Sequence, residues 1–508
     1  MAAFCATLIA ASNNSKPVCA TCHPTETARF LASAMGRSIG PPEPLPSAQI
    51  THEESQSTIA VEFKNGRMIH RLVERGLSAE YPIAYQIGSG RRGRTFAAQI
   101  GSYLLESPVS WYRERGWDVS PGYEKLQLID FDRPVTDNCL FCHAGEAKFS
   151  DADGRKLAAS NVNAITCERC HGPTEAHVQH PSAKNIVNPA KLDGPQRDGI
   201  CEQCHLEGET RIVNPGKTMH DYRAGQRLED TLVTYLYRQR GDERPAVTQV
   251  EELAASRCAR ASGGKLWCGS CHDPHGQVAN RNQQIREVCT ACHATLSRAA
   301  HPASQTECVS CHMPARSTSN IAHVAVTDHW IHRPNEVWKP TETADAVVAW
   351  RDPPDRFRQR DLALAKLEIG NEQHVPATIS ESVKLLQTLP AEQQTKDADV
   401  LSNLQAIYLQ TSSPQKAVAL SQWATEVEPR SATFAMNLGI ALKRAGEAAK
   451  AEQQLERAIE LDPSLMQAYA ELAVLYDTEE RTEDARKTID RFLQWNPQSI
   501  QFRLARRQ

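Results

Sequence analysis

The chain has 508 residues, which is too long for one hydrophobic core and predicts two or three domains. Apolar residues make up 40% of the sequence and aromatic residues 6%, so something besides side chains is expected to fill part of the interior. The formal net charge of −4, without any long basic run, excludes nucleic acid as a partner. No stretch approaches eighteen apolar residues, so no transmembrane helix is predicted.

The first segment, MAAFCATLIAAS, has the apolar residues and the small-residue end of a secretory signal. The basic start that such signals carry is missing. We therefore expect residues 1–18 to be the remnant of a signal peptide.

Cysteine is the most informative residue type, because fourteen of the sixteen cysteines fall into seven copies of the pentapeptide C-x-x-C-H. We number the copies as motifs 1 to 7 in chain order. Their residues are Cys19, Cys22 and His23 (motif 1); Cys139, Cys142 and His143 (motif 2); Cys167, Cys170 and His171 (motif 3); Cys201, Cys204 and His205 (motif 4); Cys268, Cys271 and His272 (motif 5); Cys289, Cys292 and His293 (motif 6); Cys308, Cys311 and His312 (motif 7).

This pentapeptide is the attachment signature of c-type haem. On one helical turn its three residues lie on the same face, so two thiols and an imidazole can meet one flat ligand. The thiols bind the porphyrin as thioethers, and the histidine becomes the proximal ligand of the iron. Proline follows the histidine within three residues in four motifs, which is typical of a helix that ends there. We expect seven covalently bound c-type haems, with seven irons.

Two other uses of paired cysteines compete with haem. Structural zinc sites are built from such pairs, but they need four ligands for each metal and no histidine directly after every second cysteine. A thioredoxin-like dithiol uses one motif in a βαβ unit, and seven motifs do not fit that pattern.

Between motifs 1 and 2 the chain carries a long insert, predicted over 45–135 to contain β-strands. KNGR at 64–67 predicts a two-residue hairpin turn. The flanking residues alternate, which puts one set on a single face: Ile59, Val61, Phe63, Met68, His70 and Leu72. A histidine on an apolar face is a core residue or a metal ligand, and we favour the core for His70.

The insert also contains G-x-G-x-x-G, in IGSGRRGRTF at 87–96. The pattern is typical of dinucleotide sites, but no βαβ unit surrounds it. We expect instead a loop in which Arg91, Arg92 and Arg94 meet haem propionates.

Each proximal histidine leaves the opposite face of its iron open. Eighteen histidines minus seven leave eleven, which is enough to give every iron a second imidazole. Such six-coordinate haems suit electron transfer better than substrate chemistry. Met35 is an alternative thioether ligand, although filling of the core is its favoured role. The predicted distal ligands are His52, His177, His275, His301, His323 and His329.

After about residue 345 cysteine disappears, and alanine, leucine and glutamate take up helical periodicity. Pro429, Pro463 and Pro497 are evenly spaced, and their spacing equals the period of the tetratricopeptide repeat. Residues 346–508 are therefore predicted to be a solenoid of such repeats, with a plain helical bundle as the alternative. Repeats of this kind bind peptides or partner proteins.

The motifs together resemble exported multihaem c-type cytochromes with C-terminal tetratricopeptide repeats. The haem part is similar to the tetrahaem cytochrome and hydroxylamine oxidoreductase superfamily, and the resemblance spans essentially the whole chain. It implies that His177 and His275 are distal ligands of neighbouring haems. No motif marks an open, tyrosine-linked haem, and C-x-x-C-K is absent. The stretches that carry it are PVSWYRERGWDVSPGY, CERCHGPTEAH, SGGKLWCGSCHDPHG, CVSCHMP and VAVTDHWIHRP.

The expected fold is mainly α: a haem-packed cytochrome domain over 19–345 with a small β-containing insert, followed by the repeat solenoid. The expected function is electron transfer between redox partner proteins that dock on the repeats, if necessary within a membrane-associated complex. Haem attachment outside the bacterial cytoplasmic membrane predicts a periplasmic or extracellular protein. Two alternatives stay open, a haem enzyme with one open iron that acts on a small nitrogen or oxygen compound, and a redox sensor.

Overall fold

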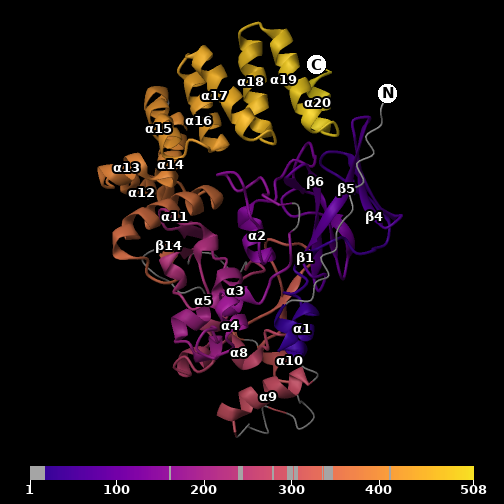
Figure 1. Cartoon of the computed structure of the whole chain (residues 1–508), viewed down its shortest axis with the longest axis vertical. Helices are drawn as coiled ribbons and strands as arrows, with labels where there is room; N and C mark the ends of the chain where they lie inside the picture. Colours follow the sequence, from indigo (N-terminus) through magenta and orange to yellow (C-terminus); the bar gives the residue numbers. More distant parts are fainter. Residues whose placement is uncertain are drawn as a thin grey trace.

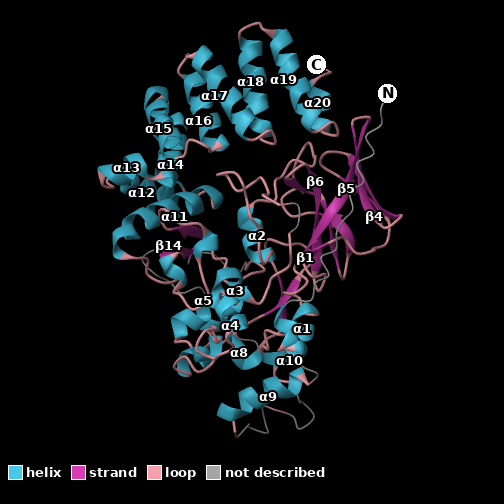
Figure 2. Cartoon of the chain, viewed as in Figure 1, coloured by secondary structure: helices cyan, strands magenta, loops and turns pink. Residues whose placement is uncertain are grey.

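A computed structural model describes residues 18–159, 162–237, 244–276, 280–294, 301, 307–334, 336, 347–410 and 413–507. The predicted signal remnant lies almost wholly outside these residues. Helices account for 45% of the chain and strands for 17%, so the prediction of a mainly α protein is confirmed only for its helical parts. Figures 1 and 2 show a sheet-containing insert, a loop-rich part with short helices, and an arc of helical pairs across one end. None of the described helices is long and apolar enough to span a membrane.

The insert is a nine-stranded antiparallel sheet with the order β2-β3-β4-β5-β6-β8-β9, to which β1 adds at β5 and β7 at β6. The first and last strands of this path, β2 and β9, touch, so the sheet curls nearly back onto itself. The strands are β1 (Ile39–Gly40), β2 (Ala48–His52), β3 (Ser57–Lys64), β4 (Arg67–Glu74), β5 (Leu77–Ile87), β6 (Gly93–Ile100), β7 (Tyr103–Glu106), β8 (Val109–Tyr112) and β9 (Gly116–Val119).

The predicted hairpin is confirmed. Lys64 pairs with Arg67 across the turn, and both turn residues, Asn65 and Gly66, have positive φ, as a two-residue hairpin requires. His70 is fully buried in the sheet core, in edge-on contact with Phe96 and other aromatic rings. It is a core residue, as favoured above.

Acidification is expected to destabilise the insert through His70. Burial lowers the pKa of His70 to about 3, against about 6.5 in an unfolded chain. Because only the unfolded chain takes up this proton, stability falls as the pH drops below 6.5, by about 2 kcal/mol between pH 7 and pH 5. Hydrogen exchange of the β4 and β5 amides, corrected for intrinsic rates, measures the change. The His70→Leu variant should lose this component; an unchanged pH dependence would contradict it.

The part that carries motifs 2 to 7 has little regular structure besides short helices and small sheets. One three-stranded sheet, β10-β11-β14, joins it to the repeats, because α11 packs against it. The helices are α1 (Pro24–Leu31), α2 (Asp137–His143), α3 (Glu168–His171), α4 (Glu175–Gln179), α5 (Gly194–His205), α6 (Gln249–Ala255), α7 (Arg257–Ala261), α8 (Cys268–Cys271), α9 (Arg281–Cys292) and α10 (Val309–His312). The strands are β10 (Thr210–Val213), β11 (Leu232–Tyr237), β12 (Ala315–Ser317), β13 (Ala325–Thr327) and β14 (Val347–Ala349).

The C-terminal arc consists of antiparallel helical pairs, as the even spacing of the three prolines predicts. Gly439 on α16 shows why small residues recur: a Cβ there would lie 2.7 Å from the Leu455 side chain on α17. The helices are α11 (Arg358–Glu372), α12 (Pro376–Gln387), α13 (Ala391–Lys396), α14 (Ala398–Gln410), α15 (Pro414–Val427), α16 (Ala432–Arg444), α17 (Ala448–Leu461), α18 (Met466–Thr478), α19 (Thr482–Trp495) and α20 (Ile500–Ala505).

Three equivalent turns of the arc bind the rest of the chain, each one just before α16, α18 or α20. Asp153 accepts hydrogen bonds from the Ser431 hydroxyl at 2.6 Å and from two amides that start α16. Arg155 forms an ion pair of 3.0 Å with Asp462 before α18. Asp130 accepts from the Ser499 hydroxyl at 2.9 Å before α20. The turns that carry the periodic prolines therefore form one edge that holds the arc against the insert and the loop after motif 2.

The Arg155→Ala variant is expected to weaken this attachment by about 2 kcal/mol, the usual range for a buried group left without its partner. The Asp462 side chain is only 1% exposed, and loss of its partner would leave a buried carboxylate. Ser464 still donates two hydrogen bonds to it, so the loss should fall below that of a fully broken buried ion pair. Urea unfolding of the full chain, followed by circular dichroism, measures the effect. The matched control is Arg430→Ala, because this exposed guanidinium only reaches Ser150 O, at 3.5 Å; equal losses in both variants would contradict the prediction.

Candidate haem sites

The seven motifs share one local geometry at the ends of short helices. Motifs 2, 3, 4 and 7 end a helix at the histidine itself, and in motifs 5 and 6 the histidine is the residue directly after the helix. In motif 1 a 3₁₀ turn comes first, and the His23 amide donates to Cys19 O at 2.7 Å. This turn brings the two thiols and the imidazole to one face, as the spacing predicts.

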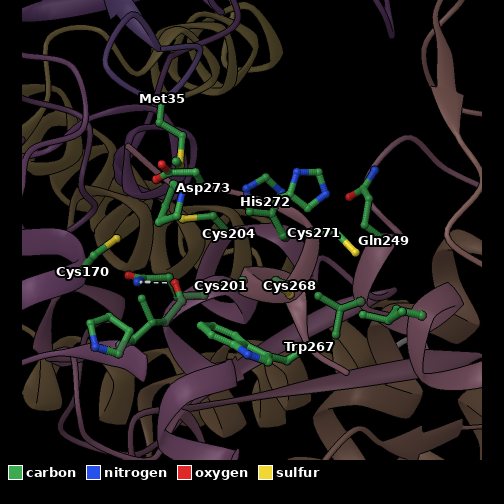
Figure 3. A pocket seen from close by; sticks show the side chains of 18 of the residues that line it. Met35, Cys170, Cys201, Cys204, Gln249, Trp267, Cys268, Cys271, His272 and Asp273 are labelled. Carbon is green, nitrogen blue, oxygen red and sulfur yellow. Dashed lines mark hydrogen bonds between the residues drawn. The ribbon is translucent and has the colours of Figure 1, made fainter. Parts of the chain in front are cut away.

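All seven motifs line a single continuous cavity of about 3490 Å³. This is several times the volume of roughly 300–1,000 Å³ typical of a site for one small ligand. Figure 3 shows thiols of motifs 3, 4 and 5 around the same space, with Cys170, Cys201 and Cys268 among them. None of the described cysteines is joined to another in a disulfide. The cavity has the size and the reactive groups to hold several flat cofactors together.

Four motif histidines face a second histidine across this cavity, with nearly parallel rings in every pair. The interplanar angles are 18° or 24°, and each pair joins one motif histidine to one histidine outside the motifs. The pairs are His23 with His177 (ring centroids 6.4 Å apart), His171 with His275 (6.0 Å), His272 with His329 (6.1 Å) and His301 with His312 (6.1 Å).

These separations fit a metal between the rings. A direct hydrogen bond of about 2.9 Å between two imidazoles would bring the centroids to roughly 5 Å. Two metal–nitrogen bonds of about 2.0 Å in line place them roughly 6 Å apart. Among the described residues no group of three or more histidine, cysteine or acidic side chains is arranged around a metal by itself, as a structural zinc site would need. The residues therefore fit an iron held between two imidazoles.

Backbone carbonyls fix the orientation of several of these rings. The Nδ1 atom of His171 contacts Val187 O at 2.8 Å, that of His312 contacts His332 O at 2.7 Å, and that of His329 contacts Thr327 O at 2.9 Å. A bond at Nδ1 selects the tautomer in which Nε2 has a free lone pair. The rings are thus prepared to bind a metal through Nε2.

Three motif histidines, His143, His205 and His293, have no facing imidazole among the described residues. Burial lowers the pKa of both His143 and His205, so these rings are neutral near pH 7. The pKa of His272 falls to about 4, first through burial and then through nearby cationic groups. Neutral imidazole is the form that binds a metal.

Two of the predicted distal ligands are contradicted by their positions. His52 is buried in the insert, where Nδ1 meets the Ser55 hydroxyl at 2.8 Å and Nε2 meets Tyr123 O at 3.0 Å, so neither nitrogen is available. His323 pairs with Asp118 at 2.9 Å. Neither residue lines the cavity. Both errors arise because distance along the sequence does not tell which side of the insert a histidine lies on.

The arginine loop and Met35 were placed correctly only in part. Arg91 and Met35 line the cavity, whereas Arg94 turns away and pairs with Glu43 at 2.7 Å. Arg281 also lines the cavity but carries no sequence motif that could have marked it. The repeats contribute lining residues as well, which no sequence pattern could have predicted: Leu364, Glu368, Asp399 and Asn403.

Thiols of different motifs lie close enough to interact, which orders the sites in space. Motif 1 meets motif 3, and motif 6 meets motif 7, while motif 4 meets motifs 2, 3 and 5. Motif 5 is also near motif 6. The order is therefore 1-3-4-5-6-7, with motif 2 as a branch at motif 4. The closest pairs are Cys19 with Cys167, Cys142 with Cys204, Cys201 with Cys268, and Cys289 with Cys308.

Comparison with known proteins supports both halves of the chain. The family model of the doubled CXXCH motif matches residues 259–298, and a tetratricopeptide repeat model matches residues 442–508. No curated protein matches. The predictions of c-type haem binding and of tetratricopeptide repeats are thus confirmed.

Solved structures with similarity to the chain are repeat proteins. MamA from Desulfovibrio magneticus RS-1 is 15% identical, over 28% of this chain and 76% of that one, with a TM-score of 0.23. YrrB, described as a TPR protein with an unusual peptide-binding site, is 20% identical over 29% and 75%, with a TM-score of 0.24. The first TPR of Spaghetti (RPAP3), bound to an HSP90 peptide, is 21% identical over 22% and 92%, with a TM-score of 0.20. The two family matches, together with the cavity, describe a chain with c-type haem motifs and tetratricopeptide repeats.

Proposed function

We propose that this chain is an exported heptahaem c-type cytochrome that carries electrons between redox partners. The observation that carries the proposal is the set of four parallel imidazole pairs, 6.0–6.4 Å apart, in a cavity lined by every motif. Bound haem iron would supply one-electron redox chemistry. The proposed axial pairs are His23/His177, His171/His275, His272/His329 and His312/His301.

The chain's own groups are suited to this role. Two imidazoles on one iron leave no face for a substrate, and Nδ1 contacts such as His171 to Val187 O hold the rings in place. Contacts between thiols of neighbouring motifs keep the attachment sites close together, which favours transfer from one site to the next. Most of the cavity wall is apolar, which keeps water from the sites.

Haem stoichiometry and spin state test the proposal. A pyridine haemochrome assay and intact mass of protein from a host competent in c-type maturation should give seven haems per chain. Electron paramagnetic resonance should show at least four low-spin irons. Bare polypeptide, or high-spin irons throughout, would refute it.

A second candidate function is a haem oxidoreductase acting on a small nitrogen or oxygen compound. It is favoured by the motif histidines without a facing imidazole in the described part of the chain, His143, His205 and His293. A high-spin ferric signal that changes on addition of nitrite, hydroxylamine or cyanide would support it. Wholly low-spin protein that ignores all three compounds would exclude it.

We further propose that redox partners dock on the repeats and that the protein works in the periplasm or outside the cell. The edge formed by the turns before α16, α18 and α20 already binds the chain itself, which leaves the remaining faces of the arc for a partner. Among them, Val474 on α18 is 51% exposed. Covalent haem attachment requires export, and this supports the proposed location.

A further inference from the structure

A cluster of arginines from two distant segments meets at the cavity beside motif 5. The loop between β5 and β6 supplies Arg91 and Arg92, the segment after β8 supplies Arg113, and α9 begins with Arg281. Arg91 and Arg281 both line the cavity, and both lie near the His272 ring. Arg281 is also close to Cys271 and to His329, the histidine that faces His272.

The loop is built to project these side chains. Gly88 and Gly90 have φ of 101° and 77°, a backbone conformation that favours glycine. A Cβ at Gly88 would lie 2.9 Å from Gly93 O, and the Gly88 amide donates to Ser38 O at 2.6 Å. The Arg113 amide donates to Arg92 O at 2.9 Å, which fixes the other end of the loop.

Like charges gather in this cluster. Burial lowers the pKa of Arg91, and the neighbouring guanidiniums of Arg281, Arg92 and Arg113 lower it further. Within the described ranges, no carboxylate lies at ion-pair distance from Arg281. Several cations at one cavity wall, in a chain of net charge −4, point to an anion that the polypeptide does not supply.

We infer that Arg91 and Arg281 bind the carboxylates of the haem attached at Cys268 and Cys271, and thereby raise the reduction potential of that haem. The inference rests on the proposed function. Guanidinium groups pair with carboxylates through two parallel hydrogen bonds and stay charged at every working pH. A cation near an iron favours its reduced form, so these two positioning residues would make motif 5 a better electron acceptor than it would be without them.

Redox potentiometry of the holoprotein tests the inference. The Arg281→Gln variant should lower the potential of one component of the titration and leave the others in place. The expected change is about tenfold in the reduction equilibrium, equal to about 59 mV for one electron. Arg281→Lys keeps the charge and should restore most of the potential. The matched control is Arg67→Gln, because Arg67 is exposed on the insert and does not line the cavity.

The outcomes separate the sources of the anion and the levels of the proposal. If inorganic phosphate shifts the wild-type potential and Arg281→Gln abolishes that shift, the site binds a soluble anion and the haem carboxylate assignment is wrong. If Arg281→Gln matches Arg67→Gln while seven haems are attached, the inference fails and the proposed function stands. If no haem is attached to the wild type, both fail.

Discussion

The His177→Ala variant is expected to contain one more high-spin ferric haem than the parent protein, out of seven. The ring of His177 lies 6.4 Å from that of His23, tilted by 18°, although the two residues come from different segments of the chain. Its Nδ1 meets Ser182 O at 3.0 Å and Asn185 Oδ1 at 3.1 Å, so the ring is held in this position. Without it the proposed motif 1 iron would have an open or water-bound face. Electron paramagnetic resonance and the high-spin absorption band measure the change.

His180 provides a matched control three residues further on. It follows the same short helix, α4, but does not line the cavity. The His180→Ala variant should therefore keep the parent spectrum, and cyanide should bind to the His177→Ala protein with one additional equivalent. Identical spectra for both variants would refute the assignment of His177, and a new high-spin signal in His180→Ala alone would transfer the role to His180.

The sequence was sufficient for features that depend on short distances along the chain. The C-x-x-C-H turns, the Asn65-Gly66 hairpin and the regularly spaced helical repeats are local patterns, and each one has the predicted structure. The resemblance also singled out His177 and His275, which both face a motif histidine.

Features that depend on long-range packing could not be predicted in this way. His52 and His323 are near motifs in the sequence, yet the curled sheet places them where Tyr123 O and Asp118 bind them. Arg281 gains its significance only because a loop of the insert reaches the same cavity wall. The use of the repeat turns as an attachment edge depends on Asp130, Asp153 and Arg155, which lie far from the repeats in sequence.

The spatial order of the motifs makes motif 4 the junction of the whole set. Its Cys201 approaches Cys268 of motif 5 and is near Cys170 of motif 3, and its Cys204 approaches Cys142 of motif 2. No thiol contact of motif 2 with any motif other than motif 4 is found in the described part of the chain. If electrons pass between neighbouring sites, motif 2 should exchange them with the others only through motif 4.

The double variant Cys201→Ser, Cys204→Ser is therefore expected to lose one haem of seven and to isolate motif 2 from the rest. The pyridine haemochrome yield should fall by about one seventh, and intact mass should show six haems. Stopped-flow reduction should split into phases, because the separated site would equilibrate with the others more slowly by at least an order of magnitude. Transfer between redox centres falls steeply with the gap that has to be crossed.

Two controls distinguish loss of the junction from general damage. Cys258→Ser removes a thiol outside the motifs and should keep seven haems and single-phase reduction. Cys19→Ser, Cys22→Ser removes the haem of motif 1, at one end of the order, and should give six haems with the remaining sites still in rapid exchange. If the variant of motif 1 splits the kinetics as strongly as the variant of motif 4, the branched order is wrong. The contacts between thiols would then describe packing of the polypeptide and not the route of the electrons.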